Sequence, residues 1–371
     1  MRKFVKKLSH REICDLELLL NGAFSPLNGF MKEEDFHSVL EVMRLADGTL
    51  WPIPIILTLS LDEQREVGLD DTIILQSPDG TDVAEMSIES LYPIAVEKQA
   101  TAIFGVDDMI HPYVQILHEQ KDYVCAGGQL RSIKEVPHDD YHDLRLSPQQ
   151  LKAKLASQGW DSIIAFQTRN PMHRSHFYLT LRALKETEGN AGIMLHPVVG
   201  VTQPVDINYQ LRVKCYKELL RYYPPERVIL SLLPLSMRMA GPREALWHAI
   251  VRKNYGATHF IVGRDHAGPS YKRSNGQSFF PPYAAQELVA EKAKEIGITP
   301  IFSQEIVYVE ETGLYLPKNE VPDGMTIAAI SGTQQRKILN DGGELPHWFT
   351  FPEISSILTS EYKLNADNSI S

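Results

Sequence analysis

The densest group of chemically capable side chains in this 371-residue sequence is QTRNPMHRSH, at residues 167–176. It follows the apolar residues 161–166, which predict a buried strand, and Asn170 with Pro171 suits the N-cap and first position of a helix. Such a helix places His173 and His176 on one face, near unpaired backbone N–H groups and the positive end of the helix dipole. This turn is suited to an anion, and in particular to a phosphate ester.

Two other interpretations of the histidine pair were weighed. A zinc site is disfavoured because no Glu follows His173 and the sequence holds no cysteine cluster. Half-buried packing is the usual role of a lone histidine on a helix. The company of Gln167, Arg169 and Asn170 in the same turn favours anion binding over packing.

A second segment of this kind, GRDHAGP at residues 263–269, follows the strand expected at 258–263. Open α/β sheets bind ligands at the carboxyl ends of their strands, so the two loops are expected to face one another across a ligand. Arg264 and His266 would add positive charge, and Asp265 could hold a ribose hydroxyl or orient a neighbouring base. The alternative is a tight turn tied by an ion pair between Arg264 and Asp265.

A third segment, SGTQQR at residues 331–336, follows the apolar residues 326–330 and precedes a helical pattern. Ser331 or Thr333 can cap the helix while Arg336 reaches back toward an anion. Capping motifs are common, so this phosphate site gains weight only from its combination with the histidine turn.

Three charged residues lie between these segments, and the sequence allows two interpretations of each. Arg238 and Arg243 would touch either a phosphate or a partner subunit, since the helix dipole alone does not favour an arginine near a helix start. Asp206 either orients a basic residue or caps the helix that follows it.

Composition narrows the class of protein. The formal net charge of −10 and a pI near 5.7 argue against non-specific nucleic-acid binding. Cys14, Cys125 and Cys215 lie far apart and form neither a zinc pattern nor an even disulfide set, which indicates a reducing cytoplasm. The basic N-terminus precedes no apolar run, and no run reaches the length of a membrane helix, so neither secretion nor membrane insertion is expected.

The elements that position these segments divide the chain into three expected domains. Residues 1–140 mix short apolar runs, such as 51–57 and 71–75, with turns, and predict a β-rich domain. Residues 141–304 alternate strands and helices, which predicts an α/β domain with a parallel sheet. Residues 305–371 form a small C-terminal domain. Within the α/β domain, further strands are expected at 193–199 and 228–233, and helices at 208–222 and 243–255.

These motifs resemble those of the ATP sulfurylase, or sulfate adenylyltransferase, family. QTRNPMHRSH, SLLPLSMRMAGPREALWHAIVRKNYGATHFIVGRDHAGP and ISGTQQR stand in the family's order, and GAFSPLNGFM resembles its N-terminal signature. The resemblance covers nearly the whole chain. It implies a PUA-like β-rich N-terminal domain, a central Rossmann-like nucleotidyltransferase domain of the HxGH adenylyltransferase type, and a small C-terminal domain. Arg174 and Ser175 stand between the two histidines, which departs from HxGH but is usual in this family.

The resemblance also implies roles for individual residues. Gln167, Arg169 and the backbone of Ala267 would bind sulfate, and Thr168 and Asn170 would act near the reacting phosphate. The implied catalytic residues are Thr168, Arg169, Asn170, His173 and His176, of which the histidines hold the ATP phosphates. The residues implied to contact ATP are Gln167, Thr168, Arg169, Asn170, His173, His176, Gly263, Arg264, Asp265, His266 and Val307, with further phosphate contacts from Ser331, Thr333 and Arg336.

The implied reaction is attack of sulfate on the α-phosphate of ATP, which gives adenosine 5′-phosphosulfate and diphosphate. Mg²⁺ is expected with ATP or diphosphate and not in a site of its own, and zinc is not expected. ATP and sulfate are the expected partners, in a cytoplasmic homo-oligomer without nucleic acid or membrane. Neither the kinase-like domain nor the cysteine-rich zinc knuckle of some relatives is expected, because the chain lacks the length, the GxxxxGK[ST] loop and the cysteines.

Two rival functions were weighed against this one. An adenylyltransferase acting on a phosphorylated acceptor would need a wider mouth than Gln167 beside Arg169 suggests, since that pair suits a small tetrahedral dianion. An RNA-binding regulatory protein is disfavoured by the acidic charge and the three phosphate loops. The sequence leaves open which direction of the reaction serves the cell.

Overall fold

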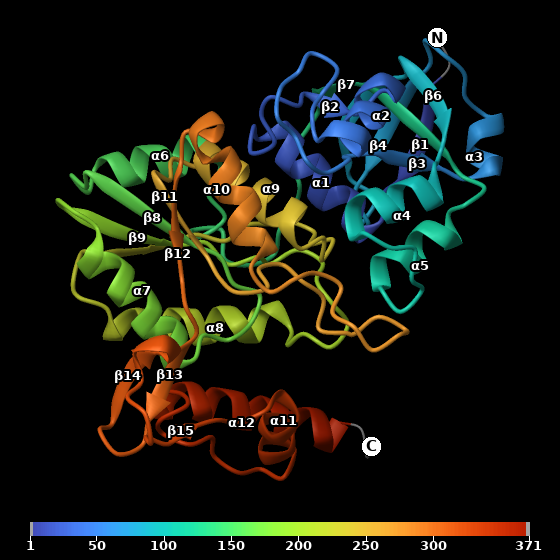
Figure 1. The fold of residues 1–371 in the computed structure, drawn as a ribbon. Helices are drawn as coiled ribbons and strands as arrows, with labels where there is room; N and C mark the ends of the chain where they lie inside the picture. The colour runs from blue at the N-terminus through green and yellow to red at the C-terminus, as the bar shows by residue number, and fades with distance from the viewer. Residues whose placement is uncertain (1–2, 369–371) are drawn as a thin grey trace.

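The computed structural model describes residues 3–368, apart from the side chains of Thr333 and of residues 363–368. Three regions, each with its own sheet, follow one another along the chain (Figure 1). We call them the N-terminal region (β1 to β7, residues 3–132), the central region (α6 to β12, residues 148–302) and the C-terminal region (β13 to α12, residues 306–368).

The N-terminal region holds a seven-stranded sheet, as a β-rich domain requires, although its helices contain more residues than its strands. Its sheet has the order β1-β4-β5-β7-β2, and β3 and β6 also pair with β7. Strand β1 runs parallel to β4, whereas the other pairs are antiparallel. The elements are β1 (Lys3–Lys7), α1 (His10–Leu20), β2 (Gly29–Phe30), α2 (Glu33–Val42), β3 (Leu57–Leu59), α3 (Leu61–Arg65), β4 (Thr72–Gln76), β5 (Asp82–Ser87), β6 (Ser90–Pro93), α4 (Val96–Phe104), α5 (Pro112–Glu119) and β7 (Val124–Ser132).

Of the apolar run at 51–57, only Leu57 belongs to a strand, β3 (Leu57–Leu59), which pairs with β7. Pro52 and Pro54 lack the N–H groups that a ladder needs, so the segment before Leu57 runs irregularly through the core. The indole of Trp51 is fully buried and donates to the carbonyl of Ile53 at 2.7 Å.

The central region holds a five-stranded parallel sheet, which confirms the expected α/β class. Its strand order is β10-β9-β8-β11-β12. The chain thus builds outward from β8 to β10 and then returns to the other side of β8, which makes the β8/β11 boundary the switch point where such sheets bind ligands. The elements are α6 (Pro148–Ala156), β8 (Ser162–Phe166), α7 (Arg174–Glu186), β9 (Ala191–Leu195), α8 (Tyr209–Leu219), a 3-10 turn (Leu220–Tyr222), β10 (Val228–Leu230), α9 (Pro242–Asn254), β11 (His259–Val262), α10 (Ala284–Ile296) and β12 (Thr299–Phe302).

Helix α9 lies between the parallel sheet and the N-terminal region (Figure 1). Its Trp247 is fully buried, with its ring centroid 5.1 Å from that of Phe24. At its end the amide of Asn254 donates to the carbonyls of Ala23 and Ser25, at 2.9 and 2.8 Å. The turn at residues 23–30, for which the sequence indicated no role, therefore docks the N-terminal region onto α9.

Arg238 and Arg243 take part in the same junction, through contacts within the chain and not with a phosphate, and a contact of Arg243 with a partner subunit stays a prediction. Arg238 is buried and pairs with Asp15 of α1. Arg243 donates to the carbonyls of Val39 and Leu40, each at 2.9 Å. The guanidinium groups of both arginines therefore join the N-terminal region to the central region.

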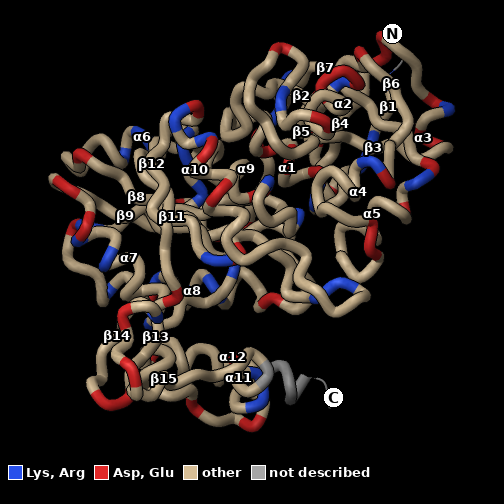
Figure 2. Tube along the Cα trace, in the orientation of Figure 1, with Lys and Arg blue, Asp and Glu red and all other residues tan. Residues whose placement is uncertain are grey.

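The C-terminal region has a small antiparallel sheet of order β14-β13-β15 and two helices, of which α12 packs on α8 (Figure 1). Its elements are β13 (Ile306–Val309), β14 (Leu314–Pro317), a 3-10 turn (Lys318–Glu320), β15 (Ile327–Ala328), α11 (Gly332–Asn340) and α12 (Pro352–Asn368). Figure 2 shows Lys and Arg distributed among Asp and Glu along the trace. Within residues 3–368, no helix is long and apolar enough to cross a membrane.

Candidate active site

The carboxyl ends of β8, β11 and β12 enclose a cavity of about 450 Å³. We call it the switch-point cavity. Its walls come from the loops after these three strands, from the start of α7 and from Met237. The predicted site residues that line it are Gln167, Thr168, Arg169, Asn170, His176, Gly263, Arg264, Asp265, His266 and Ala267. The expectation that the two loops face one another across a ligand-sized space is confirmed.

Helix α7 begins three residues later than the sequence predicted. Its N-cap is His173 and its first residue is Arg174, so the assignment of Asn170 as N-cap and Pro171 as first helical residue is wrong. The reason is a competing acceptor. The N–H of Arg174, which would close a first turn on the carbonyl of Asn170, donates instead to the carbonyl of Phe349 at 3.0 Å.

The segment before the helix is held open by other contacts to Asn170. Its carbonyl accepts from the hydroxyls of Thr168 and Tyr216, at 3.0 and 2.7 Å, and its N–H donates back to Thr168 at 3.1 Å. Polar side chains that bond to nearby backbone in this way compete with helix formation. The QTRN segment therefore remains a loop whose side chains face the cavity.

The two histidines stack at the start of α7. Their ring centroids lie 5.2 Å apart, and the backbone N–H of His173 donates to Nδ1 of His176 at 3.3 Å. Burial lowers the pKa of His176 to about 4, and burial together with the neighbouring ring holds the pKa of His173 well below its ordinary value. Both are neutral at pH 7 in this structure. His176 lines the cavity, whereas His173 lies behind it against Phe349, at 4.0 Å between ring centroids.

Arg169 is held at the cavity by an ion pair. Its Nη1 lies 2.6 and 2.7 Å from the two carboxylate oxygens of Asp206, and its Nη2 donates to the hydroxyl of Ser270 at 3.3 Å. Of the two interpretations of Asp206, orientation of a basic residue is confirmed. The following helix is capped instead by Asn208, whose side chain accepts from the N–H of Gln210.

Sequence reasoning missed two residues of α8 that support the QTRN loop. Arg212 donates to the carbonyl of Arg169 at 2.8 Å and to that of Val198 at 2.9 Å, and Tyr216 is the residue that bonds Asn170. Both are buried. Their four-residue spacing on an expected helix was the available signal, because it places an arginine and a tyrosine on one face.

The third wall, residues 303–306, was also missed. It follows β12, so the rule that ligands bind at the carboxyl ends of parallel strands would have indicated it had β12 been recognised.

The GRDHAG loop has an unusual backbone. Asp265 and Ala267 adopt φ of +51° and +57°, a region that costs a non-glycine residue about 1–3 kcal/mol. A Cβ at Gly268 would lie 2.3 Å from Oδ1 of Asp265, so a larger residue there would displace the Asp265 carboxylate. Within the described residues, the N–H of Ala267 has no hydrogen-bond partner and no ion pair joins Arg264 to Asp265. The segment is a tight turn, but it leaves a backbone donor at the cavity.

Four predicted residues lie outside the lining of the cavity. Besides His173, Val307 is buried in β13, next to the lining residue Ile306. Ser331 caps α11 as expected, by accepting from the N–H of Gln334 at 3.1 Å. Ser331 and Arg336 are exposed. The side chain of Thr333, a further predicted phosphate contact, lies outside the described residues.

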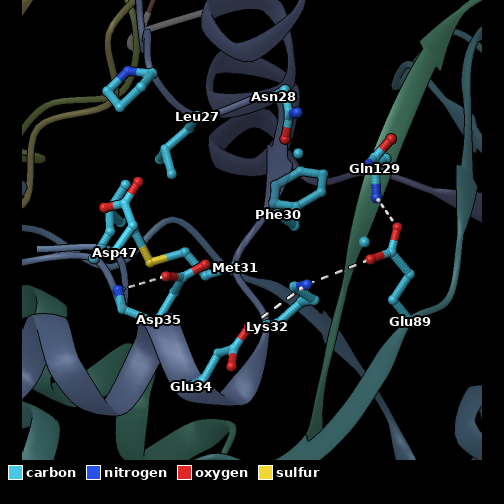
Figure 3. Close-up of a pocket in the computed structure, with 15 residues that line it drawn as sticks. Leu27, Asn28, Phe30, Met31, Lys32, Glu34, Asp35, Asp47, Glu89 and Gln129 are labelled. Atoms are coloured by element: carbon cyan, nitrogen blue, oxygen red, sulfur yellow. Dashed lines mark hydrogen bonds and ion pairs between the residues drawn. The ribbon is translucent and has the colours of Figure 1, made fainter. Parts of the chain in front are cut away.

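Other cavities are less suited to an anionic substrate. One of about 290 Å³ in the N-terminal region, which we call the N-terminal cavity, is lined by Glu34, Asp35, Asp47 and Glu89 against a single basic residue, Lys32 (Figure 3).

A larger cavity of about 750 Å³ lies at the junction between the N-terminal and central regions. The basic side chains His138 and Arg145 in its lining already lie beside carboxylates, His138 beside Glu17 at 2.9 Å and Arg145 beside Asp140 at 2.7 Å. The switch-point cavity, with its arginines and its free backbone donor, is the best candidate active site.

Comparisons with family models agree with this architecture. The ATP-sulfurylase model matches residues 142–361, more than half of the chain, and the PUA-like domain model matches residues 3–135. The expectation of a PUA-like domain followed by a nucleotidyltransferase region is confirmed.

The most similar curated proteins include two fungal sulfate adenylyltransferases. That of Eremothecium gossypii is 48% identical over 95% of this chain, and that of Schizosaccharomyces pombe is 46% identical over 96%. The chain spans 69% and 72% of those two proteins, and 63% of the sulfate adenylyltransferase of Gibberella zeae, which is 45% identical.

A similar solved structure is described as the hexameric APS kinase from Thiobacillus denitrificans. It is 28% identical, with a TM-score of 0.77, and the match covers 96% of this chain and 62% of that one. The motifs, the switch-point cavity, the matched family model and the curated relatives lead to one conclusion: this chain belongs to the ATP-sulfurylase family.

Proposed function

We propose that the switch-point cavity is where this protein transfers the adenylyl group of ATP to sulfate. The protein is an enzyme, a nucleotidyltransferase, and its family's reaction converts ATP and sulfate to adenosine 5′-phosphosulfate and diphosphate. The observation that carries the site assignment is the convergence of the QTRN and GRDHAG loops on one cavity at the β8/β11 switch point.

The sulfate subsite is proposed at Gln167, Arg169 and the N–H of Ala267. Arg169 offers a guanidinium whose fork matches a tetrahedral oxyanion, and Ala267 offers a backbone N–H that has no partner in the described part of the chain. Because Arg169 is paired with Asp206, binding of sulfate exchanges one anionic partner of this arginine for another.

The nucleotide occupies the rest of the cavity. Thr168 and Asn170 act beside the reacting α-phosphate, and His173 with His176 supports the phosphates from the start of α7. Gly263, Arg264, Asp265 and His266 line the nucleoside. Contacts of the nucleotide with Val307, Ser331, Thr333 and Arg336, which are not among the lining residues, stay a prediction from the family resemblance.

The chemistry needs positioning and charge stabilisation more than proton transfer. A sulfate oxygen attacks the α-phosphorus, the bond from that phosphorus to the bridging oxygen breaks, and diphosphate leaves with the electron pair. Sulfate carries no proton at neutral pH, so no general base is needed. The protein's task is to hold two mutually repelling anions in line and to spread the charge that develops, through Arg169, Arg264 and the donors at the start of α7.

Mg²⁺ is proposed to enter with ATP and to neutralise the leaving diphosphate. Asp265 and Glu305 are the carboxylates that line the cavity, and burial raises the pKa of Asp265. Mg²⁺ commonly keeps most of its ligands from phosphate and water and takes only one or two carboxylates, which fits this donor set.

We also propose a cytoplasmic location and a homo-oligomeric state. Cys14, Cys125 and Cys215 are free thiols, as a reducing compartment would keep them, and burial raises the pKa of each to about 12. The oligomer is suggested by the hexameric structural neighbour.

The decisive test is ATP formation by the purified protein from adenosine 5′-phosphosulfate, diphosphate and Mg²⁺, read with luciferase. ATP should appear only when all three are present, and sulfate analogues should inhibit its formation. No ATP from well-folded protein would overturn the assignment to sulfate and would turn attention to other adenylyl acceptors.

A further inference from the structure

Helix α9 carries a buried row of polar side chains that the proposed mechanism does not use. Glu244, His248 and Arg252 follow one another at intervals of four residues, and each is 0% exposed. This spacing places all three on one face of the helix. Burial of charged groups is costly unless they are partnered, so their partners indicate what the row does.

The row reaches the cavity through His266. Nδ1 of His248 lies 3.1 Å from Nε2 of His266, a residue that lines the cavity. On its other side, Nε2 of His248 lies 3.4 Å from Oε1 of Glu244 and has no closer acceptor among the described residues. The groups form a chain from the cavity wall to the first turn of α9.

The far end of this chain is a fixed acceptor. The two oxygens of Glu244 accept the backbone N–H groups of Arg238 and Ala240, at 3.0 and 2.8 Å. Burial raises the pKa of Glu244, and the two backbone donors with the nearby charge of Arg238 oppose that shift. Acceptance at both oxygens fits an ionised carboxylate, which has no proton to donate. Arg238 and Arg252 are also buried, and two buried acidic residues, Asp15 and Glu244, balance their positive charges.

Both histidines are neutral in this setting. Burial and the nearby charge of Arg252 hold the pKa of His248 well below its ordinary value, and burial does the same for His266. A neutral imidazole carries one N–H, so the two rings share one hydrogen between the facing nitrogens. The remaining question is which ring donates.

Glu244 decides the direction. Oε1 of Glu244 lies 3.4 Å from Nε2 of His248, which is longer than an ordinary hydrogen bond. Its negative charge still favours a proton on Nε2, because an unprotonated Nε2 would direct its lone pair at the carboxylate. Nδ1 of His248 is then a bare acceptor, and His266 must donate to it through Nε2. The other ring nitrogen of His266, Nδ1, is left without a proton, and among the described residues the hydrogen bond of this ring is the one through Nε2.

We propose that Glu244 and His248 are positioning residues that fix His266 with an unprotonated Nδ1 available to the nucleotide. This inference rests on the proposed function, which puts ATP in the cavity. An unprotonated nitrogen accepts hydrogen bonds and repels anionic oxygens, so His266 contacts a donor of the nucleoside, either a ribose hydroxyl or the amino group of adenine, and not a phosphate.

The test exploits two substitutions that replace one nitrogen of His248 each. In His248→Asn the amide oxygen can stand near the position of Nδ1 and still accept from His266. In His248→Gln the longer side chain reaches toward Glu244 and leaves His266 without its acceptor. The dissociation constant of ATP by calorimetry, the KM values for ATP and sulfate, and the thermal midpoint are measured for both.

We expect His248→Gln to raise the dissociation constant and the KM of ATP about tenfold, with the KM of sulfate unchanged. His248→Asn should stay within about twofold of the parent protein. A Gln variant that binds ATP normally, or an Asn variant impaired as much as the Gln variant, would overturn the proposal. Gln99→Leu, which removes a buried amide with an unpartnered oxygen in α4, is the matched control and should leave both KM values unchanged.

Nucleotide analogues identify the donor. Binding of 2′-deoxy-ATP, 3′-deoxy-ATP and inosine triphosphate is compared in the parent and the Gln variant. The analogue that lacks the group contacted by His266 should bind the parent and the Gln variant with equal affinity. If all three analogues bind the Gln variant as much more weakly as ATP does, His266 contacts none of these three groups, which would contradict the proposal. Calorimetry does not require turnover, so a parent that binds ATP but forms none refutes the proposed function alone. A parent that does not bind ATP refutes both.

Discussion

The switch-point cavity and the N-terminal cavity each measure a few hundred cubic ångströms, but the polar groups that they leave free differ. In the first, Arg169 is paired with Asp206, whereas Arg264 lines the wall and the N–H of Ala267 has no hydrogen-bond partner among the described residues. In the second, Asp35 accepts the N–H of Ala46 at 2.9 Å and Glu89 accepts that of Gln129 at 3.2 Å (Figure 3).

This difference shows what builds an anion site in an acidic protein. A net charge of −10 repels sulfate and ATP at long range, so attraction must come from donors arranged within a few ångströms. Parallel strands supply that arrangement, because their carboxyl ends bring loops distant in sequence to one edge. The antiparallel N-terminal sheet encloses a space of comparable kind, but its acidic lining suits no anion.

The largest expected effect comes from removing a donor at the switch-point cavity. Asn170→Ala or His173→Ala should lower kcat/KM by roughly a hundred- to a thousandfold, about 2.7 to 4 kcal/mol, as for other preorganised donors. Steady-state ATP formation measures it. Asn28→Ala, which removes the same kind of side chain from the N-terminal cavity, is the control and should keep normal rates. Near-normal turnover of a folded Asn170 or His173 variant would contradict the site.

The next effect concerns acid stability. The pKa of His176 is about 4 in the folded protein and about 6.5 in an unfolded chain, so the unfolded state binds more protons between these values. The neutral ring therefore contributes stability fully above pH 6.5, and the contribution is lost as the pH falls through 4, by about 3 kcal/mol. Urea unfolding from pH 7.5 to 4 should show a shallower pH dependence for His176→Gln than for the parent. Identical slopes would mean that the ring is not buried as described.

A smaller effect is expected at the back of the same cavity. Phe349 contacts the ring of His173, and aromatic pairs of this kind are worth about 0.5–1.5 kcal/mol beyond the area they bury. Phe349→Leu should therefore reduce kcat about two- to tenfold, whereas Phe349→Tyr keeps the ring and most of the rate. Equal rates for the Leu and Tyr variants would show that the contact does not position His173.

The smallest effect is expected at the N-terminal cavity. The double variant Asp47→Asn with Glu89→Gln removes two negative charges from its lining. The kcat/KM values for ATP and for sulfate should stay within about twofold of those of the parent. Exposed charges farther away than the Debye length of about 8 Å are largely screened at physiological salt. A change of fivefold or more would mean that the N-terminal cavity also takes part in substrate binding, so that the two cavities would not differ in this respect.

The sequence predicted the cavity because its parts are local. The apolar residues 161–166 and 258–263 indicate strands, and the polar residues that follow each one must share an edge once the strands are parallel. It could not predict where α7 begins, since the acceptor that keeps Arg174 from closing an earlier turn is the carbonyl of Phe349, brought there by tertiary structure.

The supports of the site were hidden for the same reason. Arg212 and His248 lie on helices that the sequence predicts. Only the tertiary structure shows that Arg212 donates to the QTRN loop and that His248 hydrogen-bonds to His266. Spacing on a helix identifies a shared face without saying what that face meets.

The junction on α9 also determines how the protein should behave when its chain is cut. Residues 133–147, which connect the N-terminal and central regions, contain no helix or strand, and residues 133–135 at their start are exposed. The regions are held instead by the Phe24–Trp247 contact and the buried pair of Asp15 and Arg238. A protease that nicks this connection should therefore leave two fragments that migrate as one particle on a native gel and part only in denaturant.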